Sequence, residues 1–158
     1  MPIVEAQEVQ EAQVYKLSKV DPSVMGQDWP LIKQTLIASA ENTGTPLTEG
    51  YLTYILDGIL KGAVTVWAGH VDDELRGIVV TAITLDQGTG CRYLVVYGIA
   101  SVSYIPPKLW KAGYTRLAEF AKANGCGSMR AMTQNDKVIR KVQQFGGDCS
   151  IRYAIMEV

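Results

Sequence analysis

Hydrophobic and polar positions follow two periods along the chain, and the longer period predicts helices. Apolar residues recur every three or four positions over 29–40, 52–59 and 109–121, as in helices that bury one face. Asp28 is expected to cap the first of these helices, with Pro30 in its first turn, and Thr48 to cap the second. Asn135 or Asp136 is expected to cap a further helix that ends near Gln144.

The shorter period, together with runs of β-branched residues, predicts strands. These runs cover residues 14–20, 63–71, 78–85, 92–100 and 128–133, and alternation predicts a terminal strand over 150–158. The segment 94–99 does not alternate, which favours a central strand with both faces covered. Gly98 can accommodate a β-bulge there, at the point where this strand would diverge from the strand at Ser128.

These elements give the order β, α, α, β, β, β, α, β, α, β. A chain of 158 residues with 47% hydrophobic content fits one domain with one sizeable core. We expect this domain to span residues 12–158, preceded by a polar arm over residues 1–11 that is rich in Glu and Gln.

Composition and charge exclude several classes of function. Fifteen basic and sixteen acidic residues leave a net charge of −1, so no nucleic-acid partner is expected. No apolar run approaches the roughly 18 residues that a membrane span needs. Three widely spaced cysteines and the lack of a secretory signal favour a cytoplasmic protein with reduced thiols. His70 is the lone histidine and there is no C-x-x-C pair, so no metal site is expected.

The second half of the chain carries a resemblance to a known family. A helix ends in AEFAKANGCG, and a short strand is followed by TQNDKVIRKVQQFGG. With the element order, this resembles the GNAT superfamily of N-acetyltransferases. The resemblance implies an α/β (α+β) fold with a mixed, mostly antiparallel central sheet and helices on both faces. It also implies an acyl-CoA-dependent N-acyltransferase, which transfers an acetyl group from acetyl-CoA to a small-molecule or protein amine and releases CoA.

The resemblance also indicates where the cofactor would bind. Family members cradle its pyrophosphate with Gln/Arg-x-x-Gly-x-Gly/Ala, but Ile105, Lys108 and Trp110 stand where Arg, Gly and Gly would be expected. Positive charge from Lys108, Lys111 and Arg116 on the same helix could substitute for the glycine loop, and the alternative, which the pattern favours, is an ordinary solvated helix face. The candidate cofactor-binding residues are Ile99, Ala100, Ser101, Lys108, Lys111 and Asn135.

The catalytic acid of the family is also replaced. A tyrosine is common in the last helix of family members, and Val142 stands at that position here. Tyr97 and Tyr104 are the nearest candidate catalytic residues. With an ordinary pKa near 10, either side chain would donate a proton to the leaving thiolate and would not act as a base. Packing is the alternative role for both.

Two other classes of function stay open, because function depends on sites and not on the fold. The first is a non-catalytic GNAT-like binding or assembly module, such as an accessory protein of a bacteriophage. The second is an enzyme that uses Cys91 or Cys126 as a reactive thiol, with Arg92 beside the first of them. The terminal strand over 150–158 is expected to pair across the edge of a homodimer.

Overall fold

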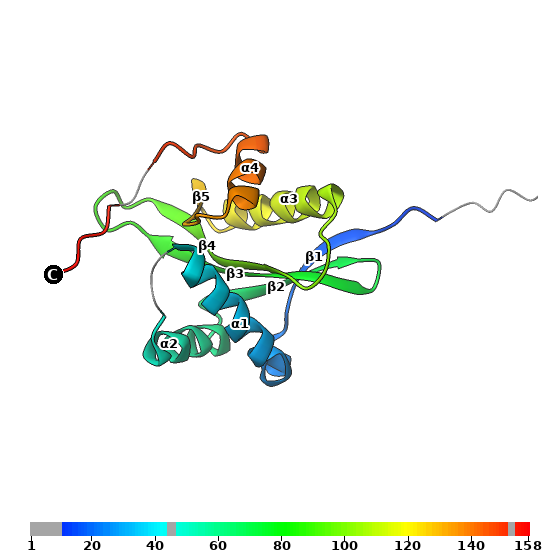
Figure 1. The fold of residues 1–158 in the computed structure, drawn as a ribbon, viewed down its shortest axis with the longest axis horizontal. Helices are drawn as coiled ribbons and strands as arrows, with labels where there is room; N and C mark the ends of the chain where they lie inside the picture. Colours follow the sequence, from blue (N-terminus) through cyan, green and yellow to red (C-terminus); the bar gives the residue numbers. More distant parts are fainter. Residues whose placement is uncertain (1–10, 44–46, 152–153) are drawn as a thin grey trace, which may run out of the picture.

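The computed structural model describes residues 11–43, 47–151 and 154–158; residues 1–10, which form most of the predicted polar arm, lie outside them. Five strands form one sheet in the order β1-β2-β3-β4-β5 (Figure 1). Their bounds are β1 Tyr15–Lys19, β2 Val64–Val71, β3 Glu74–Leu85, β4 Arg92–Ser101 and β5 Ser128–Ala131. Neighbouring strands are antiparallel except β4 and β5, which are parallel. The predicted mixed, mostly antiparallel sheet is confirmed.

Helices cover both faces of this sheet, as predicted. They are the short 3-10 helix η1 Pro22–Val24 and the α-helices α1 Met25–Thr43, α2 Glu49–Leu60, α3 Pro107–Ala123 and α4 Asp136–Gln144. Helices α1 and α2 lie against one face, while α3 lies against the other, with α4 beside it (Figure 1). The described part of the chain therefore has three layers.

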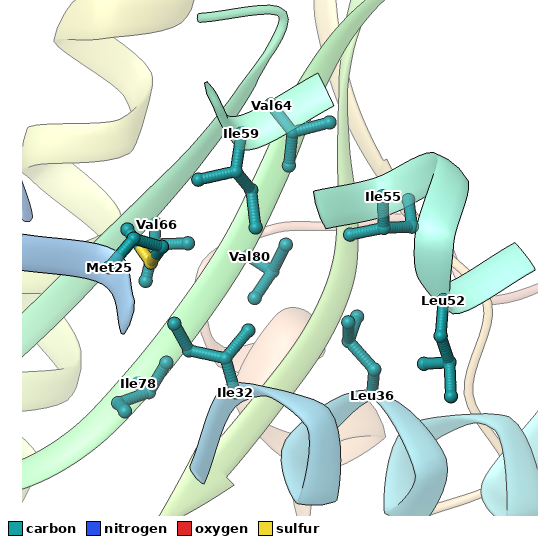
Figure 2. Close-up of a cluster of buried hydrophobic side chains, with 10 residues drawn as sticks. All are labelled: Met25, Ile32, Leu36, Leu52, Ile55, Ile59, Val64, Val66, Ile78 and Val80. Carbon is teal, nitrogen blue, oxygen red and sulfur yellow. The ribbon is translucent and has the colours of Figure 1, made fainter. Parts of the chain in front are cut away.

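The alternation of β2 divides the core between the two faces. Val64 and Val66 point toward α1 and α2, whereas Trp67 points toward α3. Figure 2 shows the first cluster, which contains Met25, Ile32, Leu36, Leu52, Ile55, Ile59, Val64, Val66, Ile78 and Val80. The second cluster contains Leu17, Trp67, Leu94, Leu117, Ala121 and Cys126. Period-two alternation in a strand produces this division, because successive side chains point to opposite faces.

Two of the predicted helix caps are confirmed and one is wrong. The Thr48 side chain accepts a hydrogen bond from the Tyr51 N–H, and the Asn135 side chain accepts one from the Lys137 N–H. Asp28 does not cap α1, because the chain already turns at η1, whose first N–H groups are capped by Asp21. Helix α1 therefore begins at Met25, and Pro30 lies inside it.

The predicted terminal strand is also wrong for the residues that the structure describes. Residues 150–151 and 154–158 belong to no strand. Ser150 donates hydrogen bonds from its N–H and its hydroxyl to Asp148 Oδ1, at 2.8 and 2.6 Å, which forms a local turn. Alternation alone does not make a strand, because the backbone also needs a neighbouring strand with which to pair.

No helix in the described ranges combines the length and apolar character that crossing a bilayer requires.

Candidate functional site

A β-bulge in the central strand β4 separates its two halves. Val80 of β3 pairs with Gly98, and Thr81 pairs with Val96, so Tyr97 is the extra residue. The bulge expected near Gly98 is therefore present. A Cβ atom on Gly98 would lie 2.9 Å from the Ser39 Oγ of α1, so the close approach of this helix favours glycine there.

Beyond the bulge, β4 continues without β5 as its partner. The parallel ladder joins Tyr93–Val96 to Ser128–Ala131 and stops there. On its other side, β4 stays paired with β3 as far as Ser101, opposite Gly77. Among the described residues, no strand pairs with residues 97–101 on the β5 side. The expected separation of the two strands is therefore present, and backbone groups of Ile99 and its neighbours are open on that side.

A small cavity lies at this separation. Its volume is about 40 Å³. Its lining comes from α1, β4, β5 and the start of α4: Ser39, Val96, Tyr97, Gly98, Ile99, Ala131, Met132, Thr133, Asn135 and Val138. A space of this size holds on the order of one to three waters, so an extended ligand arm needs a wider opening. Three of the predicted site residues meet here, namely Tyr97, Ile99 and Asn135.

Tyr97 belongs to a group of four tyrosines, which we call the tyrosine cluster: Tyr51 and Tyr54 of α2 and Tyr93 and Tyr97 of β4. The pKa of Tyr97 is raised above its usual value of 10.0, chiefly by burial. A hydrogen bond with Thr84 acts in the opposite direction, and the charges of Tyr54 and Tyr93 add to the increase. Burial also raises the pKa of Tyr51, with added effects from Tyr97 and Tyr54. Both phenols therefore keep their protons at neutral pH.

The sequence did not reveal this cluster, because its members come from two elements that are far apart along the chain. In the sequence, Tyr51 and Tyr54 were visible only as part of the amphipathic pattern of a helix. The one signal for Tyr97 was its position in a strand that does not alternate.

Asn135 is occupied by local hydrogen bonds. Its Oδ1 accepts from the Lys137 N–H at 2.9 Å, and its own N–H donates to Thr133 Oγ1 at 3.0 Å. Its side chain lines the cavity while it caps α4, so any contact with a ligand would compete with the cap.

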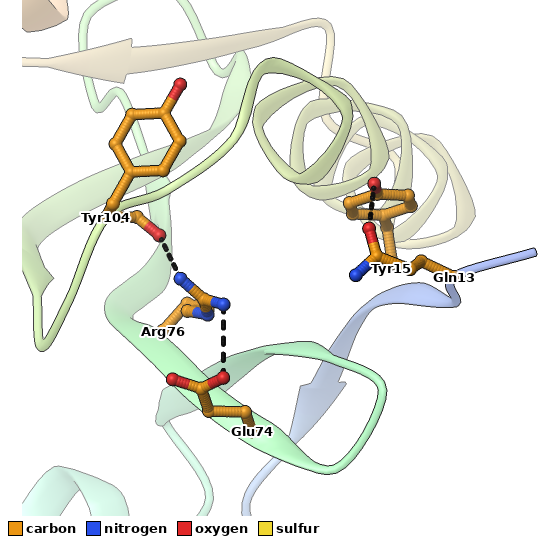
Figure 3. Close-up of polar contacts among 5 residues, drawn as sticks. All are labelled: Gln13, Tyr15, Glu74, Arg76 and Tyr104. Carbon is orange, nitrogen blue, oxygen red and sulfur yellow. Dashed lines mark hydrogen bonds and ion pairs between the residues drawn. The ribbon is translucent and has the colours of Figure 1, made fainter.

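Tyr104 lies elsewhere. Its side chain is 71% exposed, and Figure 3 shows its ring pointing away from Arg76. Its carbonyl oxygen accepts a 3.0 Å hydrogen bond from Arg76 Nη1, and Glu74 binds the other end of that guanidinium at 3.1 Å. Tyr104 is not among the residues that line the cavity.

The start of α3 offers few backbone donors. Pro106 is its N-cap and Pro107 its first residue, and neither has an N–H. The Leu109 and Trp110 N–H groups both donate to the Pro106 carbonyl, at 3.0 and 3.2 Å. Of residues 106–108, only Lys108 retains a backbone N–H. This helix start does not fit a pyrophosphate cradle built from successive backbone N–H groups.

The two predicted cofactor lysines lie in a different place from the cavity. Lys108 and Lys111 line a groove of about 570 Å³ between α3 and β1, which we call the α3–β1 groove. Its lining residues are Tyr15, Lys16, Leu17, Lys108, Lys111, Ala112, Thr115, Arg116 and Glu119. Ala100 and Ser101 line neither space. The predicted site is thus divided between the cavity, the end of β4 and the groove.

An aromatic contact joins α3 to the end of α4. The rings of Tyr114 and Phe145 stack with centroids 4.5 Å apart and an angle of 7°. No side chain of α4 is fully buried, and this stack is one of the contacts that attach the helix that carries Val138 to the cavity.

Among the described residues, two of the cysteines lie far apart in different surroundings. Cys126 is buried in the core beneath α3, and Cys91 is exposed in the turn before β4. The sulfur of Cys91 lies 3.9 Å from the Thr89 carbonyl oxygen. The ranges that the structure describes contain no group of three His, Cys, Asp or Glu side chains placed to hold a metal ion.

Comparison with known proteins identifies the fold. No family model and no curated protein matches the sequence. Among solved structures, an aminoglycoside N-acetyltransferase, AAC(6')-Iy, in complex with CoA matches with a TM-score of 0.68 and 15% identity over 95% of this chain and 98% of its own. A predicted acetyltransferase with acetyl-CoA from Clostridium acetobutylicum matches with a TM-score of 0.66 and 12% identity, over 91% and 96%.

A third solved structure belongs to a ribosomal-protein-alanine N-acetyltransferase from Brucella melitensis biovar Abortus 2308. It matches with a TM-score of 0.63 and 16% identity, over 92% of this chain and 99% of its own. All three similarities extend over nearly the whole chain, and they agree with the sheet order and the helix placement described above. The chain therefore has the fold of the GNAT-type acetyltransferases.

Proposed function

We propose that the chain is an acyl-CoA-dependent N-acyltransferase that takes acetyl-CoA as its cofactor. One observation carries the proposal, namely the bulge at Tyr97 followed by a half-strand, residues 97–101, whose backbone is open toward β5. An extended ligand arm that contains amides can hydrogen-bond to an open strand edge, as a further strand would. Ile99, Ala100 and Ser101 would hold that arm, and the cofactor supplies the activated acyl thioester when bound.

The phosphates of the cofactor would meet Lys108 first. Its backbone N–H and its ammonium group both belong to the first turn of α3, and Lys111 adds a second charge one turn later. Charge would then replace the backbone cradle that the two prolines remove. Asn135, at the start of α4, would contribute from the other wall of the cavity.

Tyr97 would act as the proton donor. It lines the cavity, and its pKa lies above the usual value because the ring is partly buried. A phenol that keeps its proton at neutral pH can protonate a leaving thiolate but cannot deprotonate an amine. The acceptor would be a small-molecule or protein amine, since the similar proteins include aminoglycoside and ribosomal-protein-alanine N-acetyltransferases.

Two observations favour a second candidate function, a binding or assembly module without catalysis. Pro106 and Pro107 remove backbone donors at the helix start, and the cavity between β4 and β5 has a volume of only about 40 Å³. A chain that kept this fold but did not bind the cofactor would need neither the backbone donors at the helix start nor a wide cavity.

Calorimetric titration with acetyl-CoA and with CoA separates the two candidates. The acyltransferase proposal expects micromolar binding that weakens about tenfold or more in Lys108→Glu, because a charge reversal beside a phosphate removes an attraction and adds a repulsion. Lys122→Glu, in the last turn of the same helix, is the matched control and should bind as the unmodified chain does. Absence of both heat and thermal shift at millimolar ligand would leave the binding module as the function.

A further inference from the structure

The α3–β1 groove carries positive charge that the rest of the described structure does not neutralise. Four cationic residues line it, Lys16, Lys108, Lys111 and Arg116, against one acidic residue, Glu119. The ion pairs found among the described residues involve Lys33, Lys61 and Arg76, so none includes a groove cation. This local excess of positive charge stands out in a chain whose net charge is −1.

The other wall of the groove is an open sheet edge. Strand β1 ends the strand order and pairs with β2. The Asp72 N–H donates to the Val14 carbonyl at 2.7 Å, and the Val20 N–H donates to the Val66 carbonyl at 2.8 Å. Because backbone groups alternate in direction along an antiparallel strand, those of Tyr15, Leu17 and Lys19 face away from β2. They offer N–H and C=O groups to a further strand.

Aromatic rings hold several of the cations beside this edge. The Arg116 guanidinium lies 5.2 Å from the centroid of the buried Trp67 ring, and Lys19 Nζ lies 4.3 Å from that of Phe120. Lys108 Nζ lies 5.8 Å from the centroid of Tyr15, whose hydroxyl donates to Gln13 Oε1 (Figure 3). Cation–π contacts of this kind restrict the side chains before a ligand arrives, which lowers the entropic cost of binding.

We propose that the α3–β1 groove binds an acidic peptide segment of a partner protein. The segment would lie in an extended conformation, as an added strand on the free edge of β1, with its carboxylates against Lys111 and Arg116 on the α3 face of the sheet. The open edge selects an extended backbone, and the cations select acidic side chains. The site shares Lys111 with the proposed cofactor site. It uses neither Tyr97 nor the cavity between β4 and β5, and Thr115, Arg116 and the edge of β1 lie outside the proposed cofactor site, so variants there test the peptide site independently of acyl transfer.

The same observations favour a peptide over a nucleic acid. An open strand edge presents alternating donors and acceptors that match a peptide backbone and not a row of phosphates. Strand β1 has five residues, so the charged wall is short, whereas nucleic-acid surfaces usually extend their positive charge across a whole face of a basic domain.

Fluorescence anisotropy with labelled peptides of about ten residues, enough to span the edge at roughly 3.3 Å per residue, tests the proposal in the full chain. We expect a peptide in which Glu alternates with Val to bind, and binding to weaken as salt increases. The same peptide with Gln in place of Glu should bind about tenfold or more weakly. Arg116→Glu and Thr115→Glu should each weaken binding about tenfold, with Lys122→Glu as the unaffected control.

A second pair of variants tests the strand edge. Lys19→Gln removes one charge, and Lys19→Pro removes the same charge together with the outward N–H, which an edge strand tolerates. Binding that is weaker in Lys19→Pro than in Lys19→Gln, at equal thermal stability, supports the added strand. Equal binding of the Glu and Gln peptides, tighter binding of a single-stranded oligonucleotide, or a doubled mass by light scattering that depends on Arg116 would each overturn the proposal.

Discussion

The indole N–H of Trp67 donates a 2.8 Å hydrogen bond to the hydroxyl of Thr81, and both residues are fully buried in the sheet. Thr81→Val keeps the shape of the side chain but leaves the indole N–H without its acceptor. A buried donor without a partner costs about 1–3 kcal/mol, so we expect the free energy of unfolding in urea to fall by that amount. Thr81→Ser keeps the oxygen and is the control. Equal stability of the Val variant and the unmodified chain would show that the bond contributes nothing.

Two glycines that pair with each other across β2 and β3 differ in the space around them. A Cβ on Gly77 would lie 2.9 Å from the Ala100 carbonyl oxygen, whereas nothing would lie closer than 3.6 Å to a Cβ on Gly69. Gly77→Ala must therefore push β3 and β4 apart, at a cost of about 1–3 kcal/mol. We expect Gly69→Ala to change the free energy of unfolding by less than half as much. Similar urea midpoints for the two variants would contradict this difference.

The tyrosine cluster predicts how stability changes at alkaline pH. The pKa values of Tyr51 and Tyr97 are raised in the folded chain, first by burial, so the folded state holds these protons more tightly than the unfolded state. Their contribution is complete below pH 10, the usual tyrosine value, and is lost as pH rises through the folded pKa values. The free energy of unfolding should therefore decline above about pH 10.

The double variant Tyr51→Phe with Tyr97→Phe should show a shallower decline over the same alkaline range, measured by urea unfolding at a series of pH values. Tyr104→Phe, at a position that is 71% exposed, is the matched control. A decline of the same slope in all three chains would assign the effect to other groups.

Arg76 fixes the segment that leads from β4 into α3. Its Nη1 donates to the Tyr104 carbonyl, and its own carbonyl accepts from the Val102 N–H at 2.8 Å and the Ser103 N–H at 3.3 Å. Arg76→Met removes the side-chain bond and keeps the backbone bonds. We expect amide exchange at Tyr104 and Ile105 to become about tenfold faster, in proportion to roughly 1.4 kcal/mol of lost local stability. Exchange in α2 serves as the internal control, and unchanged rates at Tyr104 and Ile105 would contradict the role of the guanidinium.

Several features that depend only on neighbouring residues along the chain were predicted correctly from the sequence. The caps at Thr48 and Asn135 and the bulge beside Gly98 each depend on a few neighbouring residues, and the structure contains all three. The terminal strand failed because a strand depends on a partner that its own sequence does not specify.

The candidate site was harder to predict for the same reason. Lys108 and Lys111 were identified correctly as cations of α3, but the side of the helix that they occupy is set by packing against β1. The tyrosine cluster required α2 to meet β4, which is a tertiary contact.

The two walls of the cavity between β4 and β5 are held with different strength, so its volume depends on how firmly α4 is attached. The β4 wall is held by a ladder of backbone hydrogen bonds, whereas the α4 wall, which carries Val138, has no buried side chain and is joined to α3 by the stack of Tyr114 on Phe145. An aromatic pair contributes about 0.5–1.5 kcal/mol beyond its buried area, which corresponds to a roughly two- to tenfold change in an equilibrium constant. For a long ligand such as the proposed cofactor arm, α4 and not the sheet is therefore the wall that we expect to move.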